Sequence, residues 1–240
     1  MADSTLTNTT DAVTRVPGWP GIVSDWSSDQ RAFKDVSWGK AMMWIFLLSD
    51  TFVFGCFLLS YMTVRMSTTV PWPNPSEVFA LTIGGRTVPL ILIAIMTFVL
   101  ISSSGTMAMA VNFGYRRDRV RTVALMLATA AFGATFVGMQ AFEWTKLITE
   151  GVRPWQNPSG AAQFGSAFFM ITGFHGTHVS IGVIFLIIIA RKVWRGDFDN
   201  ETRGFFTSRK GNYEIVEIMG LYWHFVDLVW VFIFALFYLW

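Results

Sequence analysis

Histidine is rare in this sequence, and each histidine lies within a long apolar stretch. The chain has three, at His175, His178 and His224, among 240 residues. Imidazole suits copper, iron and zinc, so these side chains could hold a redox metal. In membrane helices histidine also forms hydrogen bonds that hold helices together. Both interpretations are open from the residues alone, although three histidines without a nearby cysteine thiolate are too few to hold two haems.

Four carboxylates share this unusual setting. Asp50 and Asp227 lie deep within apolar stretches, whereas Glu143 and Glu217 lie near the ends of such stretches. A charge at the centre of the hydrocarbon layer is costly, and pairing or protonation lowers that cost. Asp50 and Asp227 therefore predict either a neutralised structural pair or a proton-handling site. For Glu143 we expect a helix-end ion pair with Lys146, one turn further along.

Composition places the whole chain outside the range of soluble domains. Hydrophobic residues make up 53% of the sequence and charged residues only 14%, with 23 Phe and 11 Trp. The net charge of +2 is small and the basic residues are scattered, which gives no support for a nucleic-acid partner. The single cysteine, Cys56, cannot form an internal disulfide. We expect one multi-pass membrane domain and no second domain.

Apolar stretches long enough to cross a bilayer, roughly 20 residues, recur along the chain. Residues 164–190 form the clearest one, with 27 residues and no charged side chain apart from two histidines. Residues 1–38 are polar and predict an irregular N-terminal arm, so the membrane domain would span 39–240. The pattern predicts an all-α integral membrane protein, a bundle of five transmembrane helices at about 39–66, 88–113, 122–148, 164–190 and 217–240.

The distribution of Lys and Arg predicts the orientation of these helices. With five spans, the N-terminal arm and the loops after the second and fourth spans share one side and carry 14 of the 18 basic residues. The opposite side carries 4, at Arg65, Arg86, Lys146 and Arg153. Because cytoplasmic loops hold the excess of basic residues, we expect a cytoplasmic N-terminus and a C-terminus outside.

Orientation converts sequence position into depth, at roughly 1.5 Å per residue. On that scale Asp50, His175 and Asp227 all fall roughly 15 Å from a membrane surface, near the middle of the bilayer. We therefore expect a polar cluster of these three side chains, with a structural or proton-related role. On the last span, Glu217, His224 and Asp227 fall on one helical stripe, which we expect to face protein.

Small residues predict where neighbouring helices approach closely. Such stripes let backbones pack tightly in lipid, where apolar side chains gain nothing from leaving the hydrocarbon. They recur at residues 102–105 in the second span, at Ala130, Ala134 and Gly138 in the third, and at Thr172, Gly176 and Ser180 in the fourth.

Four segments carry motifs that resemble one known family. They read WGKAMMWIFLLSDTFVFG in the first span, GMQAFEW in the third, GSAFFMITGFHGTHVSIG in the fourth and YWHFVDLVWVFIFALFYLW in the fifth. In this order and spacing they resemble subunit III of the haem-copper oxygen reductases, the cytochrome c oxidase family. The resemblance covers most of residues 38–240.

The resemblance implies a membrane subunit without a redox centre of its own. It would lie beside oxidase subunits I and II, with the haems and copper in the catalytic partner and phospholipid bound between helix groups. Asp50 occupies a position where the family most often has Glu, and the longest family members have two further helices near the N-terminus. The positions that match the family motifs are Glu143, His175, His178, Glu217, His224 and Asp227.

We therefore expect a non-catalytic subunit of a proton-pumping aerobic terminal oxidase in the bacterial cytoplasmic membrane, where it supports complex stability and proton uptake. The N-terminal arm would contact further respiratory subunits. One alternative is a subunit III-like protein associated with nitric oxide reductase. Another is a small proton channel or transporter with Asp50, His175 and Asp227 as a relay. The lack of proline inside the spans, apart from Pro89 at an edge, counts against a transporter.

Overall fold

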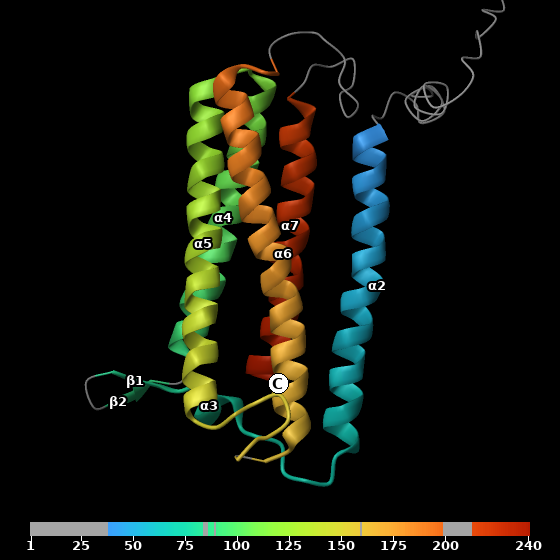
Figure 1. The fold of residues 1–240 in the computed structure, drawn as a ribbon, viewed down its shortest axis with the longest axis vertical. Coiled ribbons are helices and arrows are strands. Elements are labelled where there is room, and N and C mark those ends of the chain that lie inside the picture. The colour runs from blue at the N-terminus through green and yellow to red at the C-terminus, as the bar shows by residue number, and fades with distance from the viewer. Residues whose placement is uncertain (1–37, 84–85, 89, 159, 199–212) are drawn as a thin grey trace, which may run out of the picture.

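The described part of the chain is almost entirely helical. A computed structural model describes residues 38–83, 86–88, 90–158, 160–198 and 213–240, and the expected N-terminal arm lies outside them except for Trp38. Five helices are long and apolar enough to cross a membrane, which confirms the predicted five-span bundle (Figure 1). They are α2 (Trp38–Ser67), α4 (Ile91–Tyr115), α5 (Arg119–Thr149), α6 (Ala162–Arg195) and α7 (Glu214–Phe234).

Successive long helices run in opposite directions, and α4, α5, α6 and α7 form the compact part of the bundle (Figure 1). The starts of α2 and α7, the α4–α5 turn and the end of α6 share one end of the molecule. This is the grouping of loops on which the predicted orientation depends. Assignment of that end to the cytoplasm stays a prediction from the distribution of basic residues.

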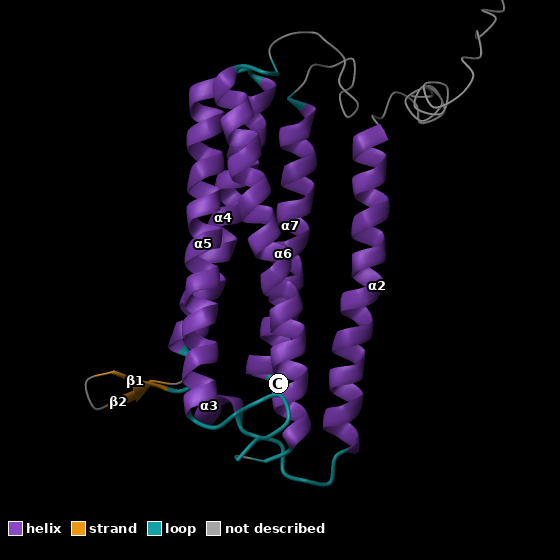
Figure 2. Cartoon of the chain, in the orientation of Figure 1, coloured by secondary structure: helices purple, strands orange, loops and turns teal. Residues whose placement is uncertain are grey.

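The connection between α2 and α4 contains short regular elements. Helix α3 (Pro75–Val78) begins at Asn74, whose side chain accepts a hydrogen bond from the backbone N–H of Ser76. A two-stranded antiparallel hairpin follows, formed by β1 (Leu81–Ile83) and β2 (Arg86–Val88) (Figure 2). Proline at the start of α3 suits the first helical turn, where the missing N–H would have no partner.

The last helix ends in a wider turn. Helix α7 continues directly into the π-helix η1 (Ala235–Leu239). A π-turn changes the direction of the side chains that follow it. Phe237 and Tyr238 are both buried as a result, and Tyr238 lies against α5.

Helix α2 stands at the edge of the bundle, beside α6 and α7 (Figure 1). Large apolar side chains such as Leu48 and Phe52 are 61% and 69% exposed. The contacts that α2 does make are largely between rings: Phe54 lies 5.2 Å from Phe174 of α6 between ring centres, and Tyr61 stacks on Phe237 of η1 at 3.9 Å. Most of the α2 surface is therefore left uncovered by the other described residues.

Close packing on α5 involves a different face from the one predicted. Gly133 is buried, and an ideal Cβ there would lie 2.5 Å from the Trp223 ring and 2.7 Å from Val183. Gly138 has nothing within 4 Å of its Cβ position, and Ala134 is exposed. Of the predicted stripe only Ala130 is buried, because lipid-facing and protein-facing surfaces are both apolar and small residues alone do not show which face meets a neighbour.

A comparison of two glycines on α5 tests this packing. Gly133→Ala should lower the midpoint of thermal unfolding in detergent, because overpacking against Trp223 and Val183 costs about 1–3 kcal/mol. Gly138→Ala should leave the midpoint unchanged or raise it, since alanine favours helix and has open space there. Equal midpoints for the two variants would contradict the described contact.

Candidate functional site

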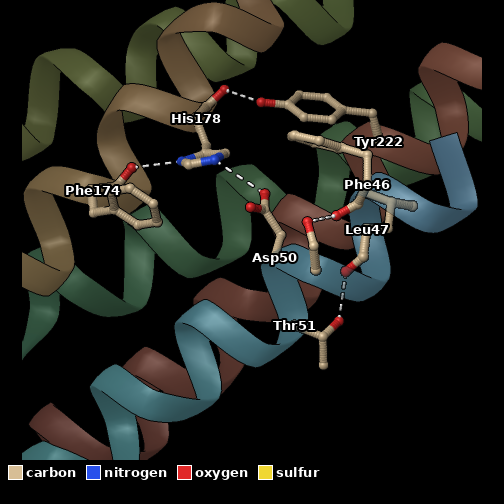
Figure 3. A network of polar contacts seen from close by, with 8 residues as sticks. Phe46, Leu47, Asp50, Thr51, Phe174, His178 and Tyr222 are labelled. Atoms are coloured by element: carbon tan, nitrogen blue, oxygen red, sulfur yellow. Dashed lines mark hydrogen bonds and ion pairs between the residues drawn. The ribbon is translucent and has the colours of Figure 1, made fainter. Parts of the chain in front are cut away.

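The closest contact between ionisable groups in the middle of the bundle joins α2 to α6. Oδ2 of Asp50 lies 3.1 Å from Nε2 of His178, and the two side chains are only 10% and 12% exposed (Figure 3). The contact has the distance of an ion pair but falls outside the angular range of a strict hydrogen bond. We refer to these two side chains as the Asp50–His178 pair.

The second ring nitrogen of His178 restricts where protons can lie in this pair. Nδ1 lies 2.8 Å from the carbonyl oxygen of Phe174, which can only accept, so Nδ1 carries a hydrogen. If Asp50 is ionised, a hydrogen on Nε2 makes the contact favourable, and the ring is then a cation. If Asp50 is protonated, a neutral ring can accept at Nε2. A proton on either group would therefore suit this contact.

Three helices meet at this pair (Figure 3). Tyr222 of α7 donates its hydroxyl hydrogen to the carbonyl oxygen of His178 at 2.9 Å. The rings of Phe54 and Phe174 lie edge-on to the His178 ring at 5.5 and 4.7 Å between ring centres. Such apolar walls strengthen the electrostatic interaction, because they keep water away from it.

His175 lies elsewhere, and this corrects the predicted pairing with Asp50. The His175 side chain is fully buried, stacked on Trp230 at 5.3 Å and edge-on to Phe136 at 5.8 Å. Neither ring nitrogen has a hydrogen-bond partner among the described residues. Both rings reach Phe54 of α2, with His175 at 6.4 Å between ring centres, but it is the His178 ring nitrogen that meets Asp50.

Asp227 lies on the side of α7 that faces α4. Asp227 is 8% exposed, and neither of its carboxyl oxygens has a hydrogen-bond partner among the described residues. No hydrogen bond therefore joins Asp50, His175 and Asp227 directly, contrary to the expected cluster. The interior holds separate polar groups at different helix contacts.

Hydroxyl side chains of α4 form a series of contacts with α7 that the sequence reasoning missed. Each hydroxyl oxygen meets a ring nitrogen of α7, at 2.5 to 3.0 Å. Residues 102–105 were expected to allow close approach through small size, yet two of their hydroxyls are hydrogen-bond partners. The signal available in the sequence was the presence of Ser and Thr in the second span and of Trp and His in the fifth. The pairs are Thr97 with Trp230, Ser103 with Trp223, and Ser104 with His224.

Glu217 occupies the first turns of α7, at the end that the charge distribution assigns to the cytoplasm. Its carboxylate accepts hydrogen bonds from Nζ of Lys40 on α2 and from the hydroxyl of Tyr115 on α4. Glu217, His224 and Asp227 all contact neighbouring helices, on the same stripe of α7. Glu217 thereby connects three helices at one end of the bundle.

Glu143 is buried at the opposite end, and its partner differs from the one predicted. The residue is 2% exposed, and its carboxylate accepts a hydrogen bond from the Tyr238 hydroxyl at 3.2 Å. Lys146 instead donates to the carbonyl oxygen of Ala80 and lies 3.6 Å from Glu150. The expected Glu143–Lys146 ion pair was wrong: Tyr238 of η1 contacts the Glu143 carboxylate, and Lys146 is turned toward Ala80 and Glu150.

The donor groups do not converge on a common point. Among the described residues, no group of three or more His, Cys, Asp or Glu side chains is arranged to hold a metal ion. His178 contacts Asp50, His224 contacts Ser104, and His175 lies between aromatic rings. This donor set fits hydrogen bonding and proton exchange better than metal binding.

Replacing both members of the Asp50–His178 pair tests their coupling. Asp50→Leu or His178→Leu alone should lower the free energy of unfolding by about 3 kcal/mol, because each leaves a buried polar partner unpaired. The double variant should cost clearly less than the sum of the two. Unfolding in mixed micelles measures this cycle. Ser49→Ala is the matched control, since the exposed Ser49 hydroxyl bonds only within α2; additive losses would contradict the pairing.

Comparison with known proteins identifies the family. A family model described as cytochrome c oxidase subunit III matches residues 24–240. The chain is 31% identical over 200 residues to a probable quinol oxidase subunit 3 of Staphylococcus aureus (strain USA300), covering 83% of this chain and 88% of the relative. A protein of the same description from Staphylococcus haemolyticus (strain JCSC1435) is 32% identical with the same coverage.

The matched region contains all five long helices and every polar group described above. The relatives and the five membrane-spanning helices identify a multi-pass protein of the bacterial cytoplasmic membrane. As a subunit III of a terminal oxidase, it associates with other oxidase subunits. The chain belongs to the cytochrome c oxidase subunit III family, the third subunit of the haem-copper oxidases.

Proposed function

We propose that this chain is a non-catalytic subunit of a proton-pumping aerobic terminal oxidase, in which it supports proton uptake and the stability of the complex. The observation that carries the proposal is the Asp50–His178 pair, a buried carboxyl group and an imidazole 3.1 Å apart between α2 and α6. Such a pair can accept or release a proton without leaving an isolated charge in the membrane. It suits a subunit that buffers proton supply to a neighbouring enzyme.

The proposed partners are oxidase subunits I and II, with the haems and copper bound in the catalytic subunit. The three histidines of this chain are engaged in separate contacts, which leaves no ligand set for a haem among the described residues. The exposed apolar side chains of α2 offer a surface for a partner helix or for phospholipid tails. Absorption spectra of the isolated chain test this point, and bound haem would contradict it.

The electron donor of the complex is proposed to bind in another subunit. The family description names cytochrome c, whereas the Staphylococcus relatives are named for quinol. The Asp50–His178 pair lies between α2 and α6 and is largely buried, which does not suit direct contact with either donor. Oxygen consumption by the purified complex, supplied in turn with reduced cytochrome c and with a quinol, identifies the donor.

Asp50→Asn in the assembled oxidase tests the proton-related role. The amide keeps the shape of the side chain but cannot exchange a proton with His178, so we expect proton-coupled turnover to slow or to fail earlier during sustained catalysis. Assembly should be retained. Oxygen consumption and proton release by vesicles that contain the complex measure both effects.

Two variants serve as controls for this experiment. Asp50→Glu restores a carboxyl group and should restore turnover, whereas Ser49→Ala changes an exposed neighbour and should leave turnover unchanged. If Asp50→Asn turns over as well as the wild type, Asp50 has a structural role only. Solute or proton transport by the isolated chain in vesicles would favour a transporter instead.

A further inference from the structure

Basic side chains gather where α4 meets α5 and where α6 ends, on the side of the bundle away from α2 (Figure 1). We propose that they bind the phosphate group of an anionic phospholipid, whose acyl chains lie along α5 and α6. The inference goes beyond the proposed function and does not depend on it, because the site is separate from the Asp50–His178 pair. The arginine patch consists of five exposed residues, Arg116, Arg117, Arg119, Arg121 and Arg195.

Hydrogen bonds fix the backbone of the α4–α5 turn. The N–H of Arg117 donates to the carbonyl oxygen of Gly114 at 3.0 Å, and the N–H of Asp118 donates to that of Phe113 at 3.1 Å. These two bonds form a Schellman motif, which ends α4. Asp118 then begins α5, where its Oδ1 accepts from the backbone N–H of Arg121 at 3.2 Å. The arginines of the turn therefore project from a backbone that is bonded on both sides.

Arginine at position 117 is unusual for such a turn. Its φ of 57° lies in the left-handed region, where glycine is usual after a helix because it has no Cβ. A side chain in this conformation costs free energy, and residues held in such conformations cluster at functional sites. Among the described residues Arg117 forms no ion pair, so its charge can meet a ligand.

Two further contacts make the arginine patch continuous. The guanidinium groups of Arg116 and Arg121 lie 5.7 and 5.1 Å from the centre of the Phe113 ring, which holds both groups beside the turn. At the end of α6, Gly196 has a φ of 78°, and an ideal Cβ there would lie 2.8 Å from Nη1 of Arg119. Arg119 thus lies against the end of α6, which carries the fifth arginine.

The two segments that form the patch are strongly basic. Residues 113–121 and 190–198 contain seven basic side chains and only two acidic ones, Asp118 and Asp197. Asp118 is already paired, with Oδ2 3.3 Å from Nε of Arg121. Basic residues at the end of membrane spans attract anionic headgroups, and each contributes about fivefold to the affinity.

Apolar side chains continue from the patch along the membrane-spanning helices, which favours a lipid over an acidic protein surface. Val120 and Trp194, beside two of the arginines, are 65% and 63% exposed. Leu127 and Ile187 lie seven residues deeper on the same helix faces and are also exposed. Tryptophan is enriched at the level of lipid headgroups. A molecule with an anionic head and apolar chains matches both parts of this surface, whereas an acidic protein loop matches only the arginines.

Spin-labelled lipids test the site in the full chain, reconstituted in phosphatidylcholine vesicles at low salt. Electron paramagnetic resonance separates lipid held by the protein from lipid in the bulk bilayer. The wild type should hold spin-labelled phosphatidylglycerol in preference to spin-labelled phosphatidylcholine, and the preference should fall as salt screens the headgroup. Equal retention of the two lipids would overturn the proposal.

Arg117→Gly separates lipid binding from folding. Glycine suits a φ of 57°, so the midpoint of thermal unfolding in phosphatidylcholine should be unchanged or higher. The preference for phosphatidylglycerol should fall by up to about fivefold, and further when Arg116→Gln is added. Arg117→Lys keeps the charge and should retain the preference. Arg153→Gln is the matched control, because it removes an exposed arginine from the α5–α6 connection at the opposite end, and it should leave the preference unchanged.

Three further outcomes would overturn the proposal. The first is an Arg153→Gln chain that loses the preference as strongly as Arg117→Gly, which would show a general effect of charge. The second is displacement of the lipid by inorganic phosphate but not by chloride of equal ionic strength, which would show a site for soluble phosphate. The third is an assembled oxidase in which Arg117 is cross-linked to a carboxyl group of a partner subunit and no phosphatidylglycerol copurifies. Since no turnover is measured, failure here is distinct from failure of the Asp50→Asn experiment.

Discussion

Polar groups inside hydrocarbon need protein partners, and the arrangement of this bundle follows from that constraint. Apolar side chains gain little when two helices meet in lipid, because the lipid tails are equally apolar. Hydrogen bonds and ion pairs are therefore what distinguish one helix face from another. In this chain they connect α2 to α6 through Asp50, α4 to α7 through Ser103 and Ser104, and α5 to η1 through Glu143.

Helix α2 shows most clearly how polar contacts attach a helix to the bundle. Its outer surface is apolar and exposed, and polar contacts join it to the bundle at three heights. The middle contact is the Asp50–His178 pair, so the group proposed to hold a proton also positions the helix. A change in its protonation would act directly on the attachment of α2. The contacts at the two ends are Lys40 with Glu217, and Arg65 with the carbonyl oxygen and ring of Trp240.

The sequence pointed to Asp50 as an interior carboxyl group but not to its partner. Counting residues from the span ends placed Asp50 near the middle of the bilayer, and the structure buries its side chain between helices. The count favoured His175 as its partner, whereas the ring nitrogen of His178 meets Asp50. The same uncertainty affected α5, where Gly133 meets a neighbouring helix and Gly138 faces outward. Both errors concern direction around a helix, for which a uniformly apolar span carries little amphipathic signal.

The sequence by itself determined the five membrane-spanning helices, the polar positions within them and the family. Long apolar runs and spaced motifs are local features, and they can be recognised without knowing which helices are neighbours. Only the tertiary structure decided that His178 meets Asp50, that Ser104 meets His224, and that Tyr238 meets Glu143. The physical reason is that lipid and protein interiors are equally apolar, so only packing shows which face of each helix meets a partner.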